Sequence, residues 1–238
     1  MSGVLSNRIA LITGASRGIG AAVAVRLARE GAHVILVART QGGLEEVDDA
    51  IRAQGGQASL VPMDLRDFDA IDRLAAVIGE RYGKLDILVG NAGVLGALSP
   101  MSHYEPKTWH QVIDINLNAN WRLIRDFDAM LRLSDAGRAM FVTSGVARIT
   151  RAYWGPYAVS KAALEKMVLS WAVELEKTNV RANIVDPGRV RTGMRKQAYP
   201  GEDPSANPDP AAITDVFVEL ASPSCARNGE IVPVTVGN

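Results

Sequence analysis

Tyr157 and Lys161, four residues apart, are the two side chains in this sequence best placed for acid–base chemistry. They open an apolar-periodic segment, from Tyr157 to about Lys177, that predicts a helix, and Pro156 suits the first turn of that helix. A spacing of four puts the phenol and the ammonium on one helix face. A phenol has a pKa near ~10 in water, and a cation beside it favours the phenolate. The pair can therefore act as a general acid or base, although an isolated pair of this kind can equally be two surface residues.

A glycine-rich turn offers a second kind of chemistry, the binding of phosphate. Gly14, Gly18 and Gly20 lie between a predicted strand at 8–13 and a predicted helix at 21–29. In such a place glycines let a pyrophosphate approach the backbone, and the helix N-terminus presents free N–H groups and the positive end of its dipole. The Gly-Lys-Ser/Thr ending of a Walker-type loop is absent. The pattern predicts a dinucleotide site, and a tight turn with a structural role is the alternative.

Two arginines indicate which dinucleotide this site prefers. The second predicted strand, 33–38, is followed by Arg39 and Thr40, with no carboxylate where NAD sites commonly hold the ribose 2′-hydroxyl. Arg39 has a planar, permanently charged guanidinium group that can donate two parallel hydrogen bonds, and Arg17 in the glycine turn has another. Together they suit a 2′-phosphate, so we predict NADP(H) in preference to NAD(H). Either arginine alone could be a solvated surface charge.

Strands and helices alternate along the chain, and the resulting fold must position these residues. Strand-length apolar runs occur at 8–13, 33–38, 57–62, 85–90, 138–143, 180–185 and 230–234. Helical patterns separate them at 21–29, 41–54, 67–82, 109–133, 157–177 and 211–220. This order predicts an α/β fold, a Rossmann-type doubly wound three-layer sandwich around a seven-stranded, mainly parallel sheet. We expect residues 1–238 to form a single dinucleotide-binding catalytic domain.

A proline-rich segment interrupts the alternation. Tyr199–Pro210 contains four of the eleven prolines, which disfavours both helix and strand. We interpret it as part of a substrate loop, about 189–210, on the surface beside a ligand pocket. Pro233, inside the last predicted strand, indicates an edge strand or a bulge.

The ends of successive strands carry small or polar residues: Asp64, Asn91–Gly93, Ser144 and Pro187–Gly188. Because parallel sheets bind ligands at the carboxyl ends of their strands, we expect these residues to converge. Ser144 stands 13 residues before Tyr157 and can reach the same pocket. Asn116 interrupts an apolar helical run and must be hydrogen-bonded if it is buried. A structural kink and a catalytic role explain Asn116 equally well.

Composition excludes several classes of partner. The 26 basic and 26 acidic residues balance, so the chain offers no bulk charge to nucleic acid or to a membrane surface. Cys225 is the only cysteine, which allows no internal disulfide and suits a reducing compartment. No apolar run of about 18 residues could cross a bilayer, and Met1–Leu5 shows no signal-peptide pattern, so we expect a cytoplasmic protein. We expect no metal in the active site, because the histidines are scattered at His33, His103 and His110.

In combination these features resemble the short-chain dehydrogenase/reductase family over nearly the whole chain, in the form of a bacterial-type single-domain member. The matching residues stand in family order and at family-like spacing: Thr13-Gly14-Ala-Ser-Arg-Gly18-Ile-Gly20, Asp64, Asn91-Ala-Gly93, Asn116, Ser144, Tyr157-x-x-x-Lys161, and Pro187-Gly188 followed by Val190 and Thr192. The ending Asn228–Asn238 keeps only a rough outline of the family's glycine-rich tail.

The resemblance implies a role for each matching residue. Tyr157 would be the catalytic acid/base, Lys161 would lower its pKa and bind the nicotinamide ribose, and Ser144 would hydrogen-bond the substrate oxygen. Asn116 would hold a water that links Lys161 to solvent. The implied cofactor contacts are Gly14, Ser16, Arg17, Gly18, Ile19 and Gly20 in the glycine turn, Asp64 and Leu65 at the adenine, Asn91, Ala92 and Gly93 at its ribose, and Tyr157, Lys161, Pro187, Gly188, Val190 and Thr192 at the nicotinamide. Arg39 joins them through the 2′-phosphate argued above.

The function expected from this resemblance is NADP(H)-dependent hydride transfer, which reduces a ketone or aldehyde or oxidises a secondary alcohol. An epimerase or dehydratase with the same pair usually needs a larger substrate domain. A catalytically silent dinucleotide-binding sensor or scaffold would not need Asn116, Ser144, Tyr157 and Lys161 together. We expect a homodimer or homotetramer. In the family the C-terminal segment helps subunits to pack. Because this chain matches the family only roughly there, a dimer through the helices around 109–133 and 157–177 is favoured over a tetramer.

Two segments should border the substrate, 145–154 and 189–210. Tyr153, Trp154 and Met194 could give an apolar or aromatic wall. Five arginines are dense in the same segments: Arg148, Arg151, Arg189, Arg191 and Arg195. One hypothesis is that some of them select a polar or anionic carbonyl substrate, and the alternative is that most face solvent or make contacts within the loops.

Overall fold

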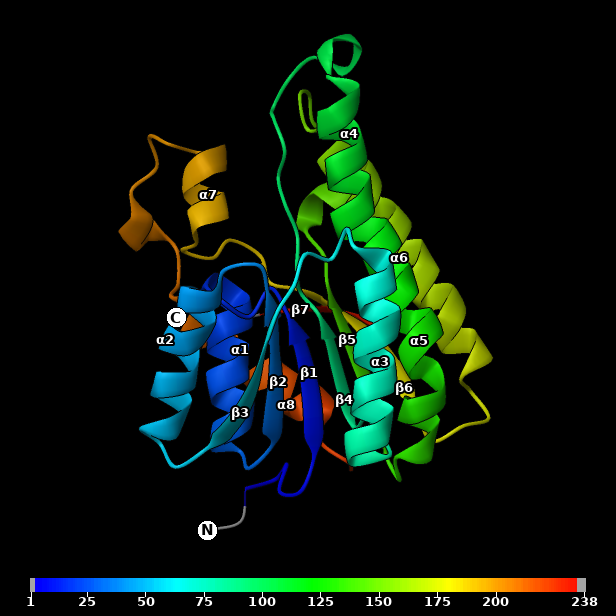
Figure 1. Cartoon of the computed structure of the whole chain (residues 1–238). Helices are drawn as coiled ribbons and strands as arrows, with labels where there is room; N and C mark the ends of the chain where they lie inside the picture. The colour runs from blue at the N-terminus through cyan, green and yellow to red at the C-terminus, as the bar shows by residue number, and fades with distance from the viewer. Residues whose placement is uncertain (1–2, 235–238) are drawn as a thin grey trace.

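A sheet of seven parallel strands forms the centre of the molecule in the computed structural model, which describes residues 3–234 (Figure 1). The strands are β1 (Ile9–Thr13), β2 (His33–Ala38), β3 (Gln57–Pro62), β4 (Ile87–Gly90), β5 (Arg138–Val142), β6 (Arg181–Asp186) and β7 (Ile231–Pro233). Their order is β3-β2-β1-β4-β5-β6-β7, and every pairing is parallel. The predicted Rossmann-type α/β sandwich is confirmed, with a sheet that is parallel throughout.

The strand order reverses beside β1, which pairs with β2 on one side and β4 on the other. In the register, Ala10 faces Val34 of β2 and Ile87 of β4. The chain therefore leaves the carboxyl ends of β1 and β4 in opposite directions, which opens a crevice between them. That crevice lies where the glycine turn and Asn91 begin.

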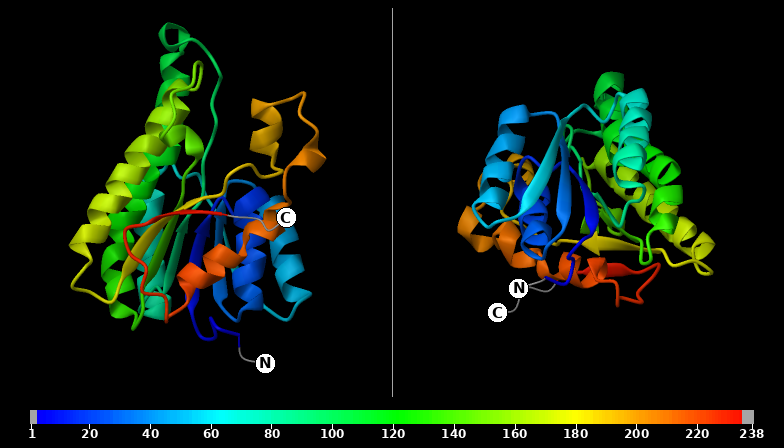
Figure 2. Two further views of the ribbon diagram at one scale, coloured as in Figure 1. Left: turned by 180° about the vertical axis from the view of Figure 1, so that it is seen from behind. Right: turned by 60° about the horizontal axis from the view of Figure 1, so that its bottom comes forward.

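Helices cover both faces of the sheet, as the two views of Figure 2 show. One layer holds α1 (Gly18–Arg29), α2 (Gln41–Arg52) and α8 (Asp215–Ala221), and the other holds α3 (Phe68–Tyr82), α5 (Ala119–Leu133) and α6 (Gly155–Glu174). Side chains alternate across each strand, so Ile12 packs into the first layer and Leu11 into the second. Burial on both faces explains why the strands are continuous apolar runs.

The long helix predicted at 109–133 contains a break in its regular hydrogen bonding. It begins earlier, with α4 (Pro106–Ile113), passes through a π-helical turn at Asp114–Asn118, and continues as α5. The buried Asn116 lies in the π turn. A π turn inserts one residue into the helix and frequently marks a functional position. The next helix, α6, begins at Gly155 with Pro156 in its first turn, as predicted.

The proline-rich segment adopts neither α-helix nor strand, as predicted, but two short 3₁₀ turns shape it, Pro204–Ala206 and Pro210–Ile213. The side chains of Asp203 and Asp209 cap them by accepting hydrogen bonds from backbone N–H groups. The turn at 210–213 delays the last helix, which begins at Asp215 instead of the predicted 211.

A short helix, α7 (Gly193–Ala198), was not predicted, because six residues carry too little periodicity to reveal it. Strand β7 lies at the edge of the sheet, as Pro233 predicted. The part of the expected tail beyond Val234 lies outside the described residues. Within residues 3–234 no helix combines the length and apolar character that a membrane span requires.

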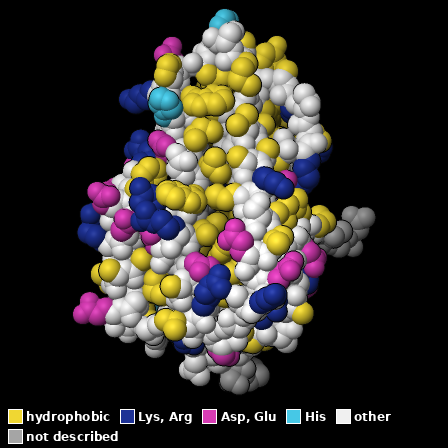
Figure 3. All heavy atoms as spheres, turned by 90° about the vertical axis from the view of Figure 1, so that its right-hand side faces the viewer, with side chains coloured by type: hydrophobic (Ala, Val, Ile, Leu, Met, Phe, Trp, Pro, Cys, Tyr) yellow, Lys and Arg dark blue, Asp and Glu magenta, His cyan; other side chains and the backbone are white. Residues whose placement is uncertain are grey.

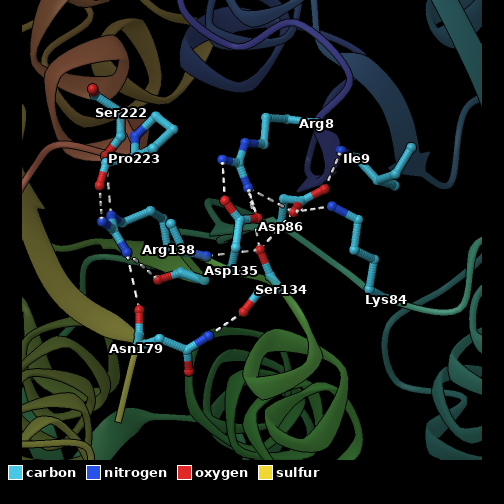
Figure 4. Close-up of polar contacts among 12 residues, drawn as sticks. Arg8, Ile9, Lys84, Asp86, Ser134, Asp135, Arg138, Asn179, Ser222 and Pro223 are labelled. Atoms are coloured by element: carbon cyan, nitrogen blue, oxygen red, sulfur yellow. Dashed lines mark hydrogen bonds and ion pairs between the residues drawn. The ribbon is translucent and has the colours of Figure 1, made fainter.

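A polar network ties the amino ends of the strands together, at the opposite end of the sheet from the crevice (Figure 4). The fully buried Asp86 precedes β4 and accepts hydrogen bonds from Arg8, Lys84 and Ser134 and from the backbone N–H of Ile9. The buried Arg138 of β5 donates to the carbonyl oxygens of Gly137, Asn179, Ser222 and Pro223. These contacts hold the strands in register and leave the other end of the sheet free for ligands.

Candidate active site

A cavity of about 730 Å³ opens at the carboxyl ends of the strands. Its size falls within the range of ordinary ligand pockets. Residues that follow each of the first six strands line it, from Gly14 after β1 to Pro187 after β6. All the site residues predicted from the sequence line this cavity except Gly20 and Asn116. The parallel sheet has brought together side chains that are up to about 180 positions apart in the chain.

The glycine turn forms the floor at one end of the cavity. Gly14 has a φ of +66°, and a Cβ there would lie 2.9 Å from the Cα of Ala92. A Cβ on Gly20 would lie 2.3 Å from the carbonyl oxygen of Gly14, so Gly20 keeps α1 close to the turn without lining the cavity. Both positions need glycine for close packing. Helix α1 has no acidic residue in its first turn, which leaves its positive end available to an anion.

Thr13 is a structural residue of this end that the predictions did not assign to the site. It is buried, and its hydroxyl accepts hydrogen bonds from the N–H groups of Asn91 and Ala92, at 3.0 and 3.1 Å. Asn91 in turn donates from Nδ2 to the carbonyl oxygen of Thr13 at 2.9 Å. These bonds join the ends of β1 and β4. A hydroxyl at the last position of an apolar strand was the signal that could have identified Thr13.

The residues beside the glycine turn fit a phosphorylated adenosine. Arg17 and Arg39 are exposed and line the cavity there. Asp64 lies nearby, and hydrogen bonds from the Arg66 guanidinium lower the pKa of that carboxyl despite partial burial. The charge of Arg39 acts in the same direction. The two guanidinium groups suit the 2′-phosphate of NADP(H), and the glycine turn with the N-terminus of α1 suits its pyrophosphate.

Tyr157, Lys161 and Ser144 all line the cavity. Tyr157 and Lys161 are 7% and 3% exposed, so both polar groups are removed from bulk water. The Nζ of Lys161 donates to the carbonyl oxygen of Val142 at 2.7 Å and lies 6.0 Å from the centre of the Tyr157 ring. The arrangement places a phenol, a hydroxyl and an ammonium within one small region, as a general acid with electrophilic neighbours requires.

Burial dominates the acid–base properties of the pair. It raises the pKa of Tyr157 to about 12, with the negative charge of Asp186 acting in the same direction and a hydrogen bond with Ser144 acting against it. Burial lowers the pKa of Lys161 to about 8, and the charge of Glu165 opposes that shift. The pKa of Tyr157 in this structure thus lies above its ordinary value, and the lowering by Lys161 that the family resemblance implies stays a prediction. At neutral pH the phenol is protonated and can donate its proton.

Asn116 lies behind Gly93, on the side of the cavity wall away from the ligand space. Its Oδ1 accepts from the N–H of Val94 at 2.8 Å, and its Nδ2 donates to the carbonyl oxygen of Val94 and to the hydroxyl of Ser160, each at 3.0 Å. A Cβ on Gly93 would lie 3.4 Å from Asn116 Oδ1 and 3.6 Å from Lys161 Nζ. Asn116 therefore holds the chain after β4 next to Lys161, and both N–H bonds of its amide are already used.

An aromatic wall closes the cavity beside Tyr157. The Trp154 ring lies 5.9 Å from the ring of Tyr157 and 6.0 Å from that of Tyr199, measured between centres. Leu95 and Met194 belong to the same apolar group. Tyr153, which was predicted to join the wall, is 60% exposed and does not line the cavity.

The arginines predicted to border the substrate are mostly engaged within the protein. Arg148 forms ion pairs with Glu165 and Asp186, Arg191 pairs with Asp209, and Arg195 pairs with Glu202. Arg151 lies over the outer faces of Trp154 and Tyr199, with its guanidinium carbon 5.4 and 5.3 Å from the ring centres. These contacts favour the alternative in which the arginines stabilise the loops. Asp64, at the adenine end, is the only carboxylate among the described residues that line the cavity.

No three of the His, Cys, Asp and Glu side chains in residues 3–234 come together in a way that could hold a metal ion. Cys225 lies apart from this cavity, in a shallow groove near α8.

Comparison with known proteins gives a consistent result. The family model described as short chain dehydrogenase matches residues 8–203. The Escherichia coli (strain K12) protein called "Uncharacterized oxidoreductase YciK" is 39% identical over 227 residues, which cover 94% of this chain and 90% of that protein. The crystal structure of a short chain dehydrogenase from Escherichia coli CFT073 complexed with NADPH has a TM-score of 0.93 and 38% identity, and the match covers 98% of both chains.

A further relative carries the other cofactor in its name. The "Uncharacterized NAD-dependent oxidoreductase MT0715" of Mycobacterium tuberculosis (strain CDC 1551 / Oshkosh) is 33% identical over 267 residues, covering 99% of this chain and 97% of that protein. Similarity of this degree therefore spans proteins described with either nicotinamide cofactor.

Proposed function

Because this chain belongs to the short-chain dehydrogenase/reductase family of oxidoreductases, we propose that it is an NADP(H)-dependent enzyme that reduces an uncharged carbonyl compound or oxidises the corresponding alcohol. The observation that carries the proposal is the convergence of Tyr157, Lys161 and Ser144 in one cavity with Arg17 and Arg39. A sensor or scaffold needs the nucleotide-binding end only, and nothing in the site favours that alternative.

The cofactor would be held along the cavity from the glycine turn to Thr192. The N-terminus of α1 would receive the pyrophosphate, and Arg17 and Arg39 would receive the 2′-phosphate. The relative complexed with NADPH supports this choice. The chemistry that such a cofactor supplies when bound is hydride transfer to the carbonyl carbon.

The residues of the chain would then manage the substrate oxygen and its proton. Ser144 would donate a hydrogen bond to the carbonyl oxygen, which orients it and stabilises the negative charge that develops there. Tyr157 would donate its phenolic proton to the same oxygen as the alcohol forms. The Lys161 ammonium, fixed by Val142, would stabilise the phenolate that remains. In alcohol oxidation the phenolate would instead accept the proton.

The wall around the substrate supports an uncharged, preferably cyclic or aromatic compound. Trp154 and Tyr199 offer ring faces, and Leu95 and Met194 offer aliphatic surface. The guanidinium of Arg195 is already paired with Glu202, so a substrate carboxylate or phosphate would have to compete for it. Burial of an unpaired anion in such a place is costly.

The test is NADPH oxidation with matched neutral and carboxylated aromatic aldehydes and ketones, using the wild type and the Tyr157→Phe and Tyr82→Phe variants. Tyr82 hydrogen-bonds to His33 and does not line the cavity, so it controls for loss of a phenol in general. We expect turnover of the neutral compounds, loss of turnover in Tyr157→Phe with NADPH binding retained, and little change in Tyr82→Phe. Turnover that survives in Tyr157→Phe would disprove the mechanism. A preference for the carboxylated compounds would disprove the substrate class.

A further inference from the structure

Arg148 reaches inward from the surface to two carboxylates behind the cavity wall. Its guanidinium forms ion pairs with Glu165 of α6 and with Asp186, the last residue of β6. The two carboxylate side chains are 8% and 12% exposed, and neither they nor Arg148 line the cavity. One cation thus joins two nearly buried anions that come from different elements.

Each carboxylate also holds a segment of the site. Glu165 lies one helical turn after Lys161 and accepts a hydrogen bond, 2.7 Å long, from the hydroxyl of Thr143. Asp186 accepts a hydrogen bond, 3.1 Å long, from the N–H of Gly188. Thr143 and Gly188 both line the cavity. The cluster therefore connects the ends of β5 and β6 with the helix that carries the acid–base pair.

The charges of the cluster act on the reacting groups. In addition to burial, the Asp186 carboxylate raises the pKa of Tyr157, and the Glu165 carboxylate raises the pKa of Lys161. Ser144, just after β5, also acts on Tyr157, because its hydrogen bond lowers the pKa of the phenol.

Removal of the cation would leave two unpaired negative charges beside the site. Buried anions that lose their partner are strongly destabilised, and they repel nearby negative charge. Carbonyl reduction would develop negative charge on an oxygen held by Ser144, the residue after the Thr143 that Glu165 binds. The phenolate left on Tyr157 would experience the same repulsion.

We propose that Arg148 is a positioning residue for the reaction, which neutralises Glu165 and Asp186 and thereby fixes both the Ser144 segment and the electric field at the acid–base pair. This inference rests on the proposed function. It also explains why the guanidinium, which can bind two carboxylates at once, stands at this position, since a lysine offers a single point charge.

The test compares Arg148→Gln and Arg148→Lys with Arg227→Gln. Arg227 also bridges two carboxylates, Glu219 and Glu230, and it lies away from the cavity, so it is a matched control for the loss of a bridging arginine. We expect Arg148→Gln to lower kcat about ten- to hundred-fold, as misplacement of a reacting group does, while the Kd of NADPH changes less than about threefold. Arg148→Lys should recover only part of the activity, and Arg227→Gln should match the wild type.

The pH profile separates an electrostatic role from a merely structural one. The rate of carbonyl reduction should fall at alkaline pH, where Lys161 loses its proton, and we call this fall the alkaline limb of the pH profile. Because the unpaired Glu165 carboxylate favours the charged ammonium of Lys161, the alkaline limb should move up by about one pH unit in Arg148→Gln. Adding Glu165→Gln and Asp186→Asn to that variant should return the limb towards its wild-type position. In the presence of Arg148, Glu165→Gln alone should move the alkaline limb of carbonyl reduction to lower pH. This variant keeps the proposal testable if Arg148→Gln does not fold.

A readout without turnover distinguishes this inference from the proposed function. The pKa of Lys161, followed by NMR of nitrogen-15-labelled lysine side chains and assigned with Lys161→Met, should rise in Arg148→Gln and fall in Glu165→Gln. If the wild type reduces carbonyl compounds but neither the limb nor the Lys161 pKa moves, the role of Arg148 is wrong and the function stands. If the pKa moves as expected but the wild type lacks turnover, the electrostatic coupling stands and the proposed function is wrong.

Discussion

Asn116 and Val94 are joined by two hydrogen bonds that run in opposite directions, from Val94 N to Asn116 Oδ1 at 2.8 Å and from Asn116 Nδ2 to Val94 O at 3.0 Å. The side-chain amide thus binds the backbone as a neighbouring strand would. It fixes the chain directly after Gly93, which lies between Asn116 and Lys161. The π turn supplies the geometry for this contact, because it places Asn116 inward within an otherwise continuous helix.

Asn116→Ala should therefore reduce stability as well as activity. The substitution leaves the half-buried N–H and carbonyl of Val94 without their side-chain partner, which costs up to about 1–3 kcal/mol for each unsatisfied group. Urea unfolding measures this loss, and Asn118→Ala, in the same π turn, is the control because Asn118 bonds only to the Asp114 side chain. Loss of activity at unchanged stability would instead favour the water-holding role that the family resemblance implies.

The residues of this contact illustrate what the sequence could and could not predict. The apolar run around Asn116 predicted a buried amide, but its partner is the backbone of Val94, and a backbone group leaves no signature in residue types. The strand ends were predictable because alternating strands and helices force them to one edge of the sheet. Helix α7 and the pairing of Arg148 with Glu165 and Asp186 depend on long-range packing.

The acid–base properties were the least predictable part of the site. A spacing of four residues put Tyr157 and Lys161 on one face, and the structure agrees. Their pKa values depend on how completely the neighbouring elements exclude water, which no local pattern reports. The sequence accordingly indicated which groups are the candidates for acid–base chemistry, and the direction of the Tyr157 pKa shift came from the structure.

Arg39→Ala should weaken NADPH binding much more than NADH binding. The lost charge-assisted contact to a 2′-phosphate is worth about 1.5–3 kcal/mol, or roughly ten- to 150-fold in Kd. Fluorescence titration with both cofactors measures the effect, and Arg73→Ala, an exposed arginine of α3 that pairs with Asp67, controls for net charge. Equal binding of NADPH and NADH by the wild type would contradict the assignment of Arg17 and Arg39 to the 2′-phosphate.

Reduction and oxidation should respond to pH in opposite ways. Since the pKa of Tyr157 is about 12, the phenol stays protonated at neutral pH and reduction should be constant there. Reduction should decline as pH rises past about 8, where Lys161 loses its proton. Alcohol oxidation needs the phenolate and should increase from neutral towards mildly alkaline pH. Measurement of kcat/KM in both directions tests this, and a reduction rate that falls on the acid side of neutrality would contradict it.

The outer face of α5 and α6 should form a dimer interface. Hydrophobic side chains gather in a band on this side of the molecule (Figure 3). Exposed apolar residues on the two helices are Trp121, Leu133, Val159 and Val173. We expect light scattering after size-exclusion chromatography to give a dimer, which Trp121→Ser weakens at least tenfold because aromatic residues dominate such interfaces. Val77→Ser, at an equally exposed site on α3, should leave it intact, and a wild-type monomer at all concentrations would exclude the interface.

Asp86→Asn should destabilise the protein at neutral pH, and the effect should vanish in acid. Although burial opposes it, hydrogen bonds from Lys84, Ser134 and Arg8 and from the Ile9 N–H lower the pKa of Asp86 below its usual range. A depressed carboxyl pKa contributes stability above the unfolded-state value near ~3.9 and loses it as pH falls through the folded value. Asp86→Asn replaces charge-assisted hydrogen bonds, each worth about 1.5–3 kcal/mol, with neutral ones.

Urea unfolding of wild type, Asp86→Asn and Asp135→Asn across this pH range measures the effect of the Asp86 network. Asp135 pairs with the same Arg8, but its side chain is 70% exposed, so solvent screens the pair and Asp135→Asn should stay close to the wild type at neutral pH. The free-energy difference between wild type and Asp86→Asn should shrink steadily below about pH 4, because wild-type Asp86 then becomes neutral as well. A difference that stays constant into acid would mean that Asp86 acts through packing and not through its charge, and the strand starts would then be held by the hydrogen-bond geometry of Ser134 and Ile9 alone.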